Sequence, residues 1–229
     1  MLCILGSCSP KIRENLDSIE LNTIPELVLK AYNSIDSDTF FEICQLLNDS
    51  IANRTDYFHL EATDCINIYE DEITKNEISL CFMESNERLP NGIPNELLFY
   101  ICIKDEKTIF IQHKQANISD LKEKAKKYIF EPDSLGKNIV LRKKHTDSFG
   151  EVEVSKVGVI LSINAQENRL SSNEWLLFFK SLRELINVFE DKRDSFSVKK
   201  TGKKFNSLTF EEKEAISDIV GYQITLFFD

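Results

Sequence analysis

The feature that most constrains the fold is the alternation of short apolar runs with amphipathic stripes in the second half of the chain. Runs typical of buried strands occur at 96–104, 108–114, 138–144 and 157–164. Stripes with helical spacing occur at 118–130 and 172–190. Helices with one apolar face must bury it against an apolar layer. This order therefore predicts an α+β fold, a two-layer domain with helices on one face of a small mixed sheet.

The helix expected over 172–190 is the strongest single signal. Ser171 and Glu174 form a capping box at its start. Its apolar stripe comprises Trp175, Phe178, Phe179, Leu182, Leu185, Ile186 and Phe189. We interpret this stripe as core; as an exposed face, it would make the chain a homodimer. Further expectations are that Ser119 caps the helix over 118–130, that Thr209 and Glu212 cap a last short helix, and that the tail 222–229 is an edge strand.

The clearest break in the chain is 86–96, which carries two prolines, a glycine and an Asn-Gly pair. We therefore expect a lipoprotein signal remnant and linker at 1–22, an N-terminal α+β accessory segment at 23–88, and the main domain at 96–229. Within the accessory segment we expect a helix with a capping box of Thr23 and Glu26, a second helix after Asp38, and strands at 65–70 and 77–83.

The first ten residues, MLCILGSCSP, bear on the compartment. Leu5-Gly6-Ser7-Cys8 resembles the lipobox of bacterial lipoproteins, in which the cysteine receives the lipid. A basic start and an apolar stretch of about 7–15 residues are missing, which a start codon upstream of Met1 would explain. The alternative is a short buried strand of a cytoplasmic protein. We expect a chain that faces the periplasm, held to a bacterial membrane only by a lipid on Cys8, because no apolar run reaches the roughly 18–20 residues that span a bilayer.

Charge and residue type argue against several functions. A net charge of −10 argues against broad nucleic-acid binding, which needs cations to replace counterions on phosphate. No C-x-x-C pair, phosphate-binding glycine loop or local histidine cluster is present, so we expect no catalytic residue, metal or cofactor. His59, His113 and His145 are interpreted as solvated or locally bonded. The cysteines, at 3, 8, 44, 65, 81 and 102, are interpreted as buried thiols. In an exported chain, a disulfide among Cys44, Cys65, Cys81 and Cys102 is an option, but spacing does not select the pair.

One stretch departs from the acidic balance of the chain. Six cations fall within thirteen positions: Lys192, Arg193, Lys199, Lys200, Lys203 and Lys204. We interpret this stretch as a contact for an acidic partner or an anionic wall polymer. The expected partner-binding residues are Lys199, Lys200, Lys203, Lys204 and Phe205, with Phe196 as a second apolar anchor. The alternative is a mobile loop that only adds solubility.

Residues 96–132 read ELLFYICIKDEKTIFIQHKQANISDLKEKAKKYIFEP, where a strand pair leads into a helix rich in Lys and Glu. This order resembles the periplasmic domain of ExbD/TolR-family biopolymer transport proteins, and the resemblance extends from residue 96 to about 220. It rests also on Gly202-Lys203-Lys204-Phe205 through Ile216, which is similar to the extended C-terminal section of ExbD proteins in Bacteroidetes. The family's membrane helix and proton-relaying Asp have no counterpart in this sequence, so the chain is not expected to conduct protons.

This resemblance implies a non-enzymatic interaction module of TonB-type energy transduction. Its implied partners are ExbB-like or TonB-like proteins, peptidoglycan, or a second copy in a homodimer, with no nucleic acid. Two other interpretations stay open: a peptidoglycan-associated lipoprotein unrelated to energy transduction, and a small enzyme with its site in the N-terminal half. Fold likeness alone does not decide among them.

Overall fold

The structure is a computed structural model that describes residues 24–34, 37–53, 65–71, 76–82, 97–132, 140–164 and 169–228. The chain divides into two compact units, Met1–Arg54 and Thr55–Asp229. Several features that the sequence analysis singled out lie outside the described residues. These are Cys8 with its lipobox, Thr23, His59 and the break at 86–96.

The described part of the first unit consists of two helices, α2 (Ile24–Asn33) and α3 (Ser37–Asn53). Both have the apolar spacing that the sequence predicts, and those positions are buried: Leu27, Val28 and Ala31 in α2, and Phe40, Ile43, Cys44, Leu47 and Ile51 in α3. Residues three and four apart share one side of a helix, so each helix buries a single stripe.

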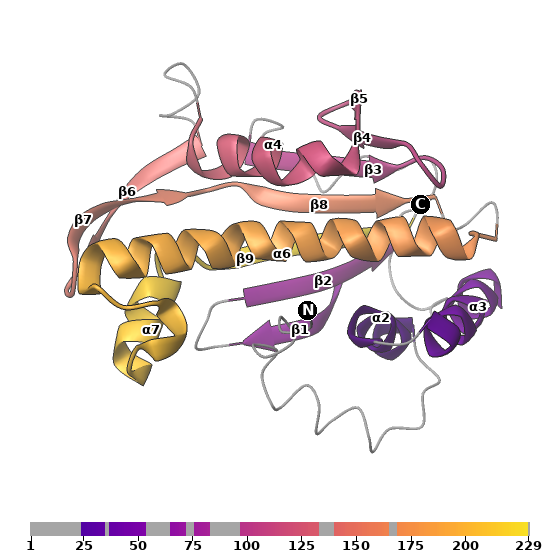
Figure 1. Cartoon of the computed structure of the whole chain (residues 1–229), viewed down its shortest axis with the longest axis horizontal. Coiled ribbons are helices and arrows are strands. Elements are labelled where there is room, and N and C mark those ends of the chain that lie inside the picture. The colour runs from indigo at the N-terminus through magenta and orange to yellow at the C-terminus, as the bar shows by residue number, and fades with distance from the viewer. Residues whose placement is uncertain are drawn as a thin grey trace. The chain divides into compact units, whose positions relative to one another are not determined.

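The second unit is built on one mixed sheet, whose described strands run in the order β1-β2-β9-β8-β3-β4-β5 (Figure 1). Neighbours among β2, β9, β8 and β3 are parallel, whereas β1, β4 and β5 join by antiparallel pairing. The strands are β1 (Cys65–Asp71), β2 (Asn76–Phe82), β3 (Leu98–Ile103), β4 (Ile109–Ile111), β5 (Lys114–Ala116), β8 (Gly158–Ile163) and β9 (Tyr222–Phe228).

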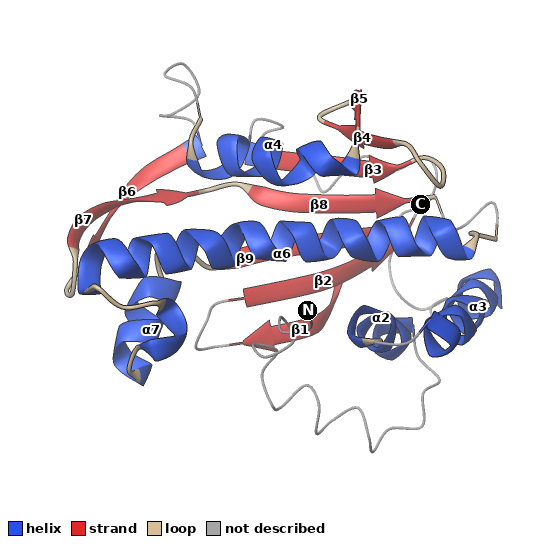
Figure 2. Cartoon of the chain, viewed as in Figure 1, coloured by secondary structure: helices blue, strands red, loops and turns tan. Residues whose placement is uncertain are grey.

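Two helices, α4 (Ile118–Phe130) and α6 (Ser172–Thr201), lie across one face of this sheet (Figure 2). Aromatic contacts join the layers: Phe99 of β3 meets Tyr128 of α4 with ring centroids 5.4 Å apart, and Trp175 of α6 meets Phe228 of β9 at 5.5 Å. The predicted two-layer α+β class is confirmed. All seven residues of the stripe in α6 are buried, as expected of core. That face is therefore not available for a homodimer.

A two-stranded hairpin, β6 (Leu141–Thr146) and β7 (Gly150–Ser155), forms a second small sheet. Its inner residues Val152 and Val154 are buried with Ile219 and Val220, which precede β9. The sequence analysis placed no strand between the runs at 138–144 and 157–164, and so missed β7. The strand was inconspicuous because glutamates occupy its exposed alternate positions, leaving only two valines as an apolar signal.

Two predictions about the ends of the sheet are wrong. The tail 222–229 was expected at an edge, but β9 lies between β2 and β8 in the middle of the sheet. The strands near 65–82 were assigned to an N-terminal accessory segment, but β2 pairs with β9, with Ile78 opposite Ile224. A parallel partner from the far end of the chain leaves no local pattern, so sequence spacing could not reveal this pairing.

The predicted capping boxes of α6 and of α7 (Phe210–Ser217) are confirmed. Ser171 Oγ accepts from the Glu174 N–H at 3.2 Å, and the Glu174 carboxylate accepts from the Ser171 N–H at 2.7 Å. Thr209 and Glu212 form the same reciprocal pair. Ser119 does not cap α4, because that helix already begins at Ile118 after Asn117, which makes no side-chain cap.

The turn between β4 and β5 is a two-residue connection in which Gln112 and His113 have positive φ, 50° and 63°. Such values are unfavourable for residues other than glycine. Gln112 compensates by extending the pairing with β3 beyond the end of β4. Its N–H donates to the Tyr100 carbonyl at 2.9 Å, and its side-chain amide accepts from the Tyr100 N–H at 3.0 Å and donates to the Leu98 carbonyl at 3.1 Å.

Candidate interaction surface

The C-terminal end of α6 carries the first two lysines of the predicted contact. Lys199 and Lys200 are exposed in its last turn, where cations interact favourably with the helix dipole. The helix ends at Gly202, which has φ 74° and donates its N–H to the Val198 carbonyl at 3.0 Å. Glycine is favoured at this position by its left-handed backbone. Lack of space is not the reason, since a Cβ built there would meet nothing within 4 Å. The helix extends beyond the predicted 172–190 and includes Lys199 and Lys200, for which a mobile loop was the alternative interpretation.

The following turn carries Lys203 and Lys204, and side chains of the helix hold it in place. Ser197 Oγ donates to the Lys203 carbonyl at 2.6 Å, and Thr201 Oγ1 accepts from the Lys203 N–H at 3.2 Å. The Phe205 N–H donates to the Asp194 carboxylate at 3.0 Å. These bonds position the backbone of the turn and leave both lysine side chains exposed. The alternative of a freely mobile loop does not fit this bonding.

Phe205 was predicted as a partner-binding residue, and its side chain is only 8% exposed. It begins the short 3-10 helix η2 (Phe205–Ser207) and packs with Leu208 and Ile216. Its ring also lies 5.4 Å from the buried Arg193 guanidinium. In this position, Phe205 anchors the turn that presents Lys203 and Lys204, so the structure gives it a positioning role.

Lys200 lies above two aromatic rings, of which the sequence analysis named only Phe196. Its ammonium is 6.0 Å from the centre of Phe149 and 5.8 Å from that of Phe196, and the two rings meet edge to face at 5.6 Å. Phe149 comes from the β6–β7 turn and was not predicted. A cation above such rings gains roughly 0.5–1 kcal/mol at an exposed site. The rings therefore orient Lys200 without neutralising its charge.

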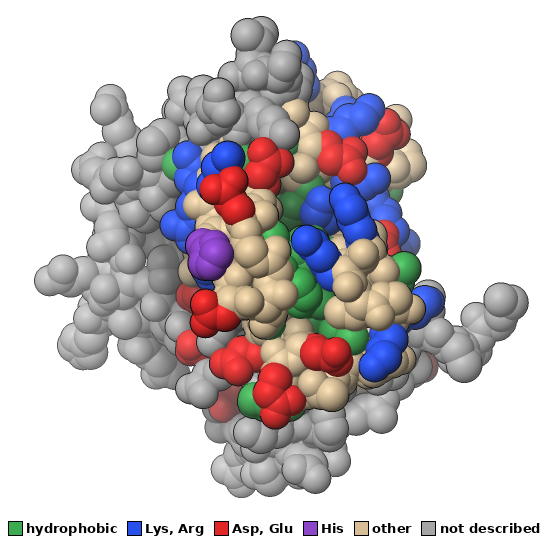
Figure 3. All heavy atoms as spheres, turned by 90° about the vertical axis from the view of Figure 1, so that its left-hand side faces the viewer, with side chains coloured by type: hydrophobic (Ala, Val, Ile, Leu, Met, Phe, Trp, Pro, Cys, Tyr) green, Lys and Arg blue, Asp and Glu red, His purple; other side chains and the backbone are tan. Residues whose placement is uncertain are grey.

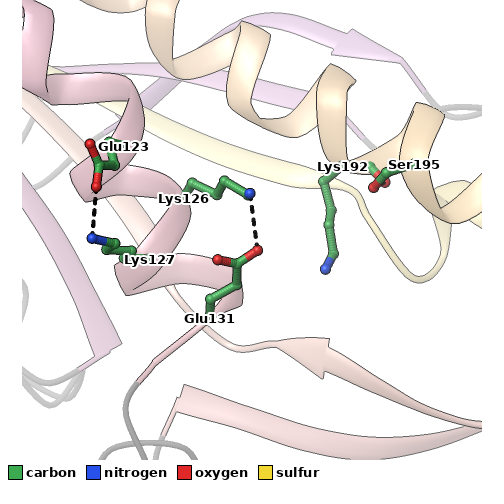
Figure 4. Close-up of polar contacts among 6 residues, drawn as sticks. All are labelled: Glu123, Lys126, Lys127, Glu131, Lys192 and Ser195. Carbon is green, nitrogen blue, oxygen red and sulfur yellow. Dashed lines mark hydrogen bonds and ion pairs between the residues drawn. The ribbon is translucent and has the colours of Figure 1, made fainter.

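Two of the six cations that the sequence grouped together do not belong to the exposed set. Arg193 is 3% exposed and donates from Nε to the Val220 carbonyl. Lys192 is half-buried, with its ammonium 5.3 Å from the centre of the Phe130 ring, and Figure 4 shows its side chain extending from α6. Burial lowers the pKa of Lys192 below its ordinary value, and the Glu131 carboxylate partly opposes that shift. Lys192 therefore faces α4, and Arg193 faces the residues that lead into β9.

Among the described residues of this unit, six other lysines form ion pairs with carboxylates. Figure 4 shows two such pairs, Lys127 with Glu123 at 2.7 Å and Lys126 with Glu131 at 3.2 Å. Lys122, Lys124, Lys143 and Lys144 also have carboxylate partners within 4.0 Å. Within the described part of the chain, no such ion pair is found for Lys199, Lys200, Lys203 or Lys204.

We define these four residues as the basic surface. In Figure 3, lysine and arginine side chains gather around apolar atoms on the end of the unit formed by the end of α6, α7 and the β6–β7 hairpin, and acidic side chains lie along its margins. Local positive potential on a chain with a net charge of −10 can orient an acidic partner. The structure thus brings together four of the five predicted contact residues as exposed side chains.

The remaining candidate residues do not assemble into a site. His113 lies in the β4–β5 turn and His145 on β6, and each is exposed. A search of the described ranges finds no group of three or more His, Cys, Asp or Glu residues able to hold a metal ion. Among the same residues, no helix is both long and apolar enough to cross a membrane.

Comparisons with known proteins yield no match: no protein-family model, curated protein or solved structure is significantly similar to this chain. The fold and the basic surface therefore carry the functional argument, together with the sequence resemblance described above.

Proposed function

We propose that this chain is a non-enzymatic interaction module whose basic surface binds an acidic partner. The observation that carries the proposal is the grouping of four exposed lysines on one helix end and the turn that follows it. Lysines on α4 and β6 are matched with carboxylates, whereas Lys199, Lys200, Lys203 and Lys204 are presented together, exposed and without such partners among the described residues. Unpaired like charges held within one helix end and turn repel each other, and an acidic partner relieves that repulsion.

The bonding of the turn supports recognition rather than general solubility. Ser197, Thr201 and Asp194 fix the backbone that presents Lys203 and Lys204. The phenylalanine pair below Lys200 limits the orientations of that side chain. Groups that are ordered before binding lose less conformational entropy when a partner arrives. A surface of this kind favours a defined acidic protein surface over a diffuse counterion cloud.

The resemblance to the ExbD/TolR family supplies the proposed setting. We place the module on the periplasmic side, anchored by a lipid on Cys8, with an ExbB-like or TonB-like protein as its partner. In that arrangement a lipid takes the place of the family's membrane helix, and the module transmits contact without conducting protons. Its role is then in TonB-type biopolymer transport.

Binding by charge-reversed chains tests the contact. The variant carries Lys199→Glu, Lys200→Glu, Lys203→Glu and Lys204→Glu. Its matched control carries Lys104→Glu, Lys107→Glu, Lys114→Glu and Lys156→Glu, which are also exposed and change the net charge equally. The probes are the purified periplasmic part of a TonB-like protein of the same organism and isolated peptidoglycan. We expect the first variant to weaken binding to the TonB-like protein by about tenfold or more, and the control to leave it nearly unchanged.

Three results would contradict parts of this proposal. Equal loss in both variants would show that net charge, not the basic surface, governs binding. Binding to peptidoglycan alone would favour the wall-associated lipoprotein without a link to energy transduction. For the anchor, labelled palmitate should enter the wild type and not Cys8→Ala, and an in-frame signal upstream of Met1 should be present in the DNA. Unlabelled wild type would contradict the lipid anchor.

A further inference from the structure

The structure places two of the six cysteines directly opposite each other on neighbouring strands. β1 and β2 pair antiparallel, and in their register Cys65 is the partner of Cys81. Opposed residues of an antiparallel pair lie on the same face of the sheet, with Cα atoms about 4.5–5.5 Å apart. Cα atoms joined by a disulfide lie roughly 4.4–6.8 Å apart. We propose that Cys65 and Cys81 form a reversible disulfide that fastens β1 to β2.

The same strand order argues against the competing pairs. Cys102 lies on β3, which is separated from β2 by β9 and β8. Three strand spacings of about 4.8 Å amount to roughly 14 Å, about twice the reach of a disulfide. Cys44 belongs to the other unit, and both Cys44 and Cys102 are buried free thiols. The register therefore makes a selection among the four cysteines that sequence spacing could not make.

The position of the pair gives the disulfide a mechanical consequence. Residues 72–75 connect β1 to β2 at one end of the hairpin, next to the opposed Asp71 and Asn76. Cys65 begins β1, and Cys81 is the last residue but one of β2, so the link closes the other end. β1 is the edge strand of the described sheet. Oxidation thus fastens an edge strand at the end where it can fray, and it restricts the unfolded chain between 65 and 81.

The chemistry requires only a thiol–disulfide oxidant, such as oxidised glutathione. The thiolate of one cysteine attacks the oxidant's disulfide, which forms a mixed disulfide and releases one reduced glutathione. The second thiolate then attacks the protein sulfur of that mixed disulfide and releases the second glutathione. Two electrons pass from the protein to the oxidant, and the two thiol protons end on the two glutathione thiols. The inference does not depend on the proposed function, because the register holds in any compartment.

Peptide mapping of the full-length chain tests the pairing. The reduced protein is held in a buffer of oxidised and reduced glutathione, free thiols are then blocked with N-ethylmaleimide, and the chain is digested with trypsin. Cleavage after Arg54, Lys75 and Arg88 separates the two cysteines, so the disulfide joins peptides 55–75 and 76–88. We expect this linked pair as the main disulfide product and a Tm higher by roughly 5 °C than that of the reduced chain.

Control variants make the test specific. Cys102→Ser should keep the linked peptides and the rise in Tm. Cys81→Ser should abolish both and convert Cys65 into a glutathione adduct. The inference is overturned if the wild type shows glutathione adducts on both cysteines without the link, or if either residue pairs instead with Cys44 or Cys102. Thiol trapping in intact cells is a separate arm: a pair that oxidises in glutathione but is reduced in cells keeps this inference and contradicts the periplasmic location.

Discussion

Arg193 of α6 donates a hydrogen bond from Nε to the carbonyl oxygen of Val220 over 2.7 Å, which ties the long helix to the residues that lead into β9. The same guanidinium donates from Nη2 to Asn76 at the start of β2 and lies over the rings of Phe205 and Tyr222. One buried side chain therefore joins α6, η2, β2 and β9. It links the turn that presents the basic surface to the central strands of the sheet.

Replacing Arg193 should destabilise the second unit. Arg193→Ala removes a buried side chain and leaves the Val220 carbonyl and Asn76 amide without this donor, so we expect a loss of about 3 kcal/mol in the free energy of unfolding. Arg193→Lys should recover only part of it, because an ammonium lacks the planar fork that reaches both acceptors between two rings. Urea unfolding of the three proteins measures this. Full recovery by lysine would show that charge alone suffices.

Trp175 should report on the packing of α6 against the sheet. It is the single tryptophan of the chain, has no exposed surface, and contacts Phe178, Phe179 and Phe228. Trp175→Ala should lower the free energy of unfolding by about 3–5 kcal/mol, and Trp175→Phe by less. Wild-type fluorescence should be blue-shifted when folded and should move to the red on unfolding. Emission typical of an exposed indole in the native protein would contradict the described core.

Gln112 should stabilise the β4–β5 turn through its side chain. Gln112→Ala removes the two bonds from the amide to the backbone of β3, leaving the Tyr100 N–H and the Leu98 carbonyl to find other partners. We expect a loss of about 1–2 kcal/mol. His113→Gly is the matched change in the same turn; it relieves a positive φ at the expense of the ring contact with Tyr100, and should have a smaller effect. Thermal unfolding compares the two variants, and equal losses would argue against the special role of Gln112.

Cys44 should make the stability of the first unit depend on pH at the alkaline end. Burial raises the pKa of its thiol from an ordinary value of 9.0 to about 12. Above pH 9 the thiol ionises in the unfolded chain but stays protonated in the folded one, so unfolding releases a proton. Stability present below pH 9 is therefore lost as pH rises toward 12, with a slope of up to ~1.4 kcal/mol per pH unit.

The effect of Cys44 is measured as the difference in the pH dependence of unfolding free energy between the wild type and Cys44→Ala. Cys44→Ala lacks the thiol, so its stability should fall less steeply than that of the wild type between pH 8 and pH 10. Circular dichroism with urea at each pH measures both slopes, and other groups that titrate in this range cancel in the difference. Parallel slopes would show that the thiol ionises equally well in the folded protein.

Local patterns predicted the parts of the fold that local chemistry governs. The capping boxes at Ser171 and Thr209 were readable because the paired residues lie three positions apart and bond within one turn. The stripe beginning at Trp175 was readable because burial on one side of a helix repeats with the helical period. The cap assigned to Ser119 is wrong because α4 begins at Ile118, two residues before the start that a Ser119 cap would give.

The basic surface was only partly visible in the sequence. Proximity along the chain grouped Arg193 and Lys192 with the lysines that follow, although helical rotation turns these two toward the sheet and α4. Phe149 was missed because it comes from a different hairpin and meets Phe196 only in the folded unit. No residue spacing contains that information.

The sequence by itself determined the two-layer class, the principal helices and the run of lysines, because each depends on side chains within a few turns of one another. Tertiary structure decided that β9 lies at the centre of the sheet, that Cys65 stands opposite Cys81, and that Arg193 is buried while Lys199 and Lys200 at the end of the same helix are exposed. These features depend on contacts between segments distant in sequence, whose energies are settled only when the whole sheet and its helices pack together.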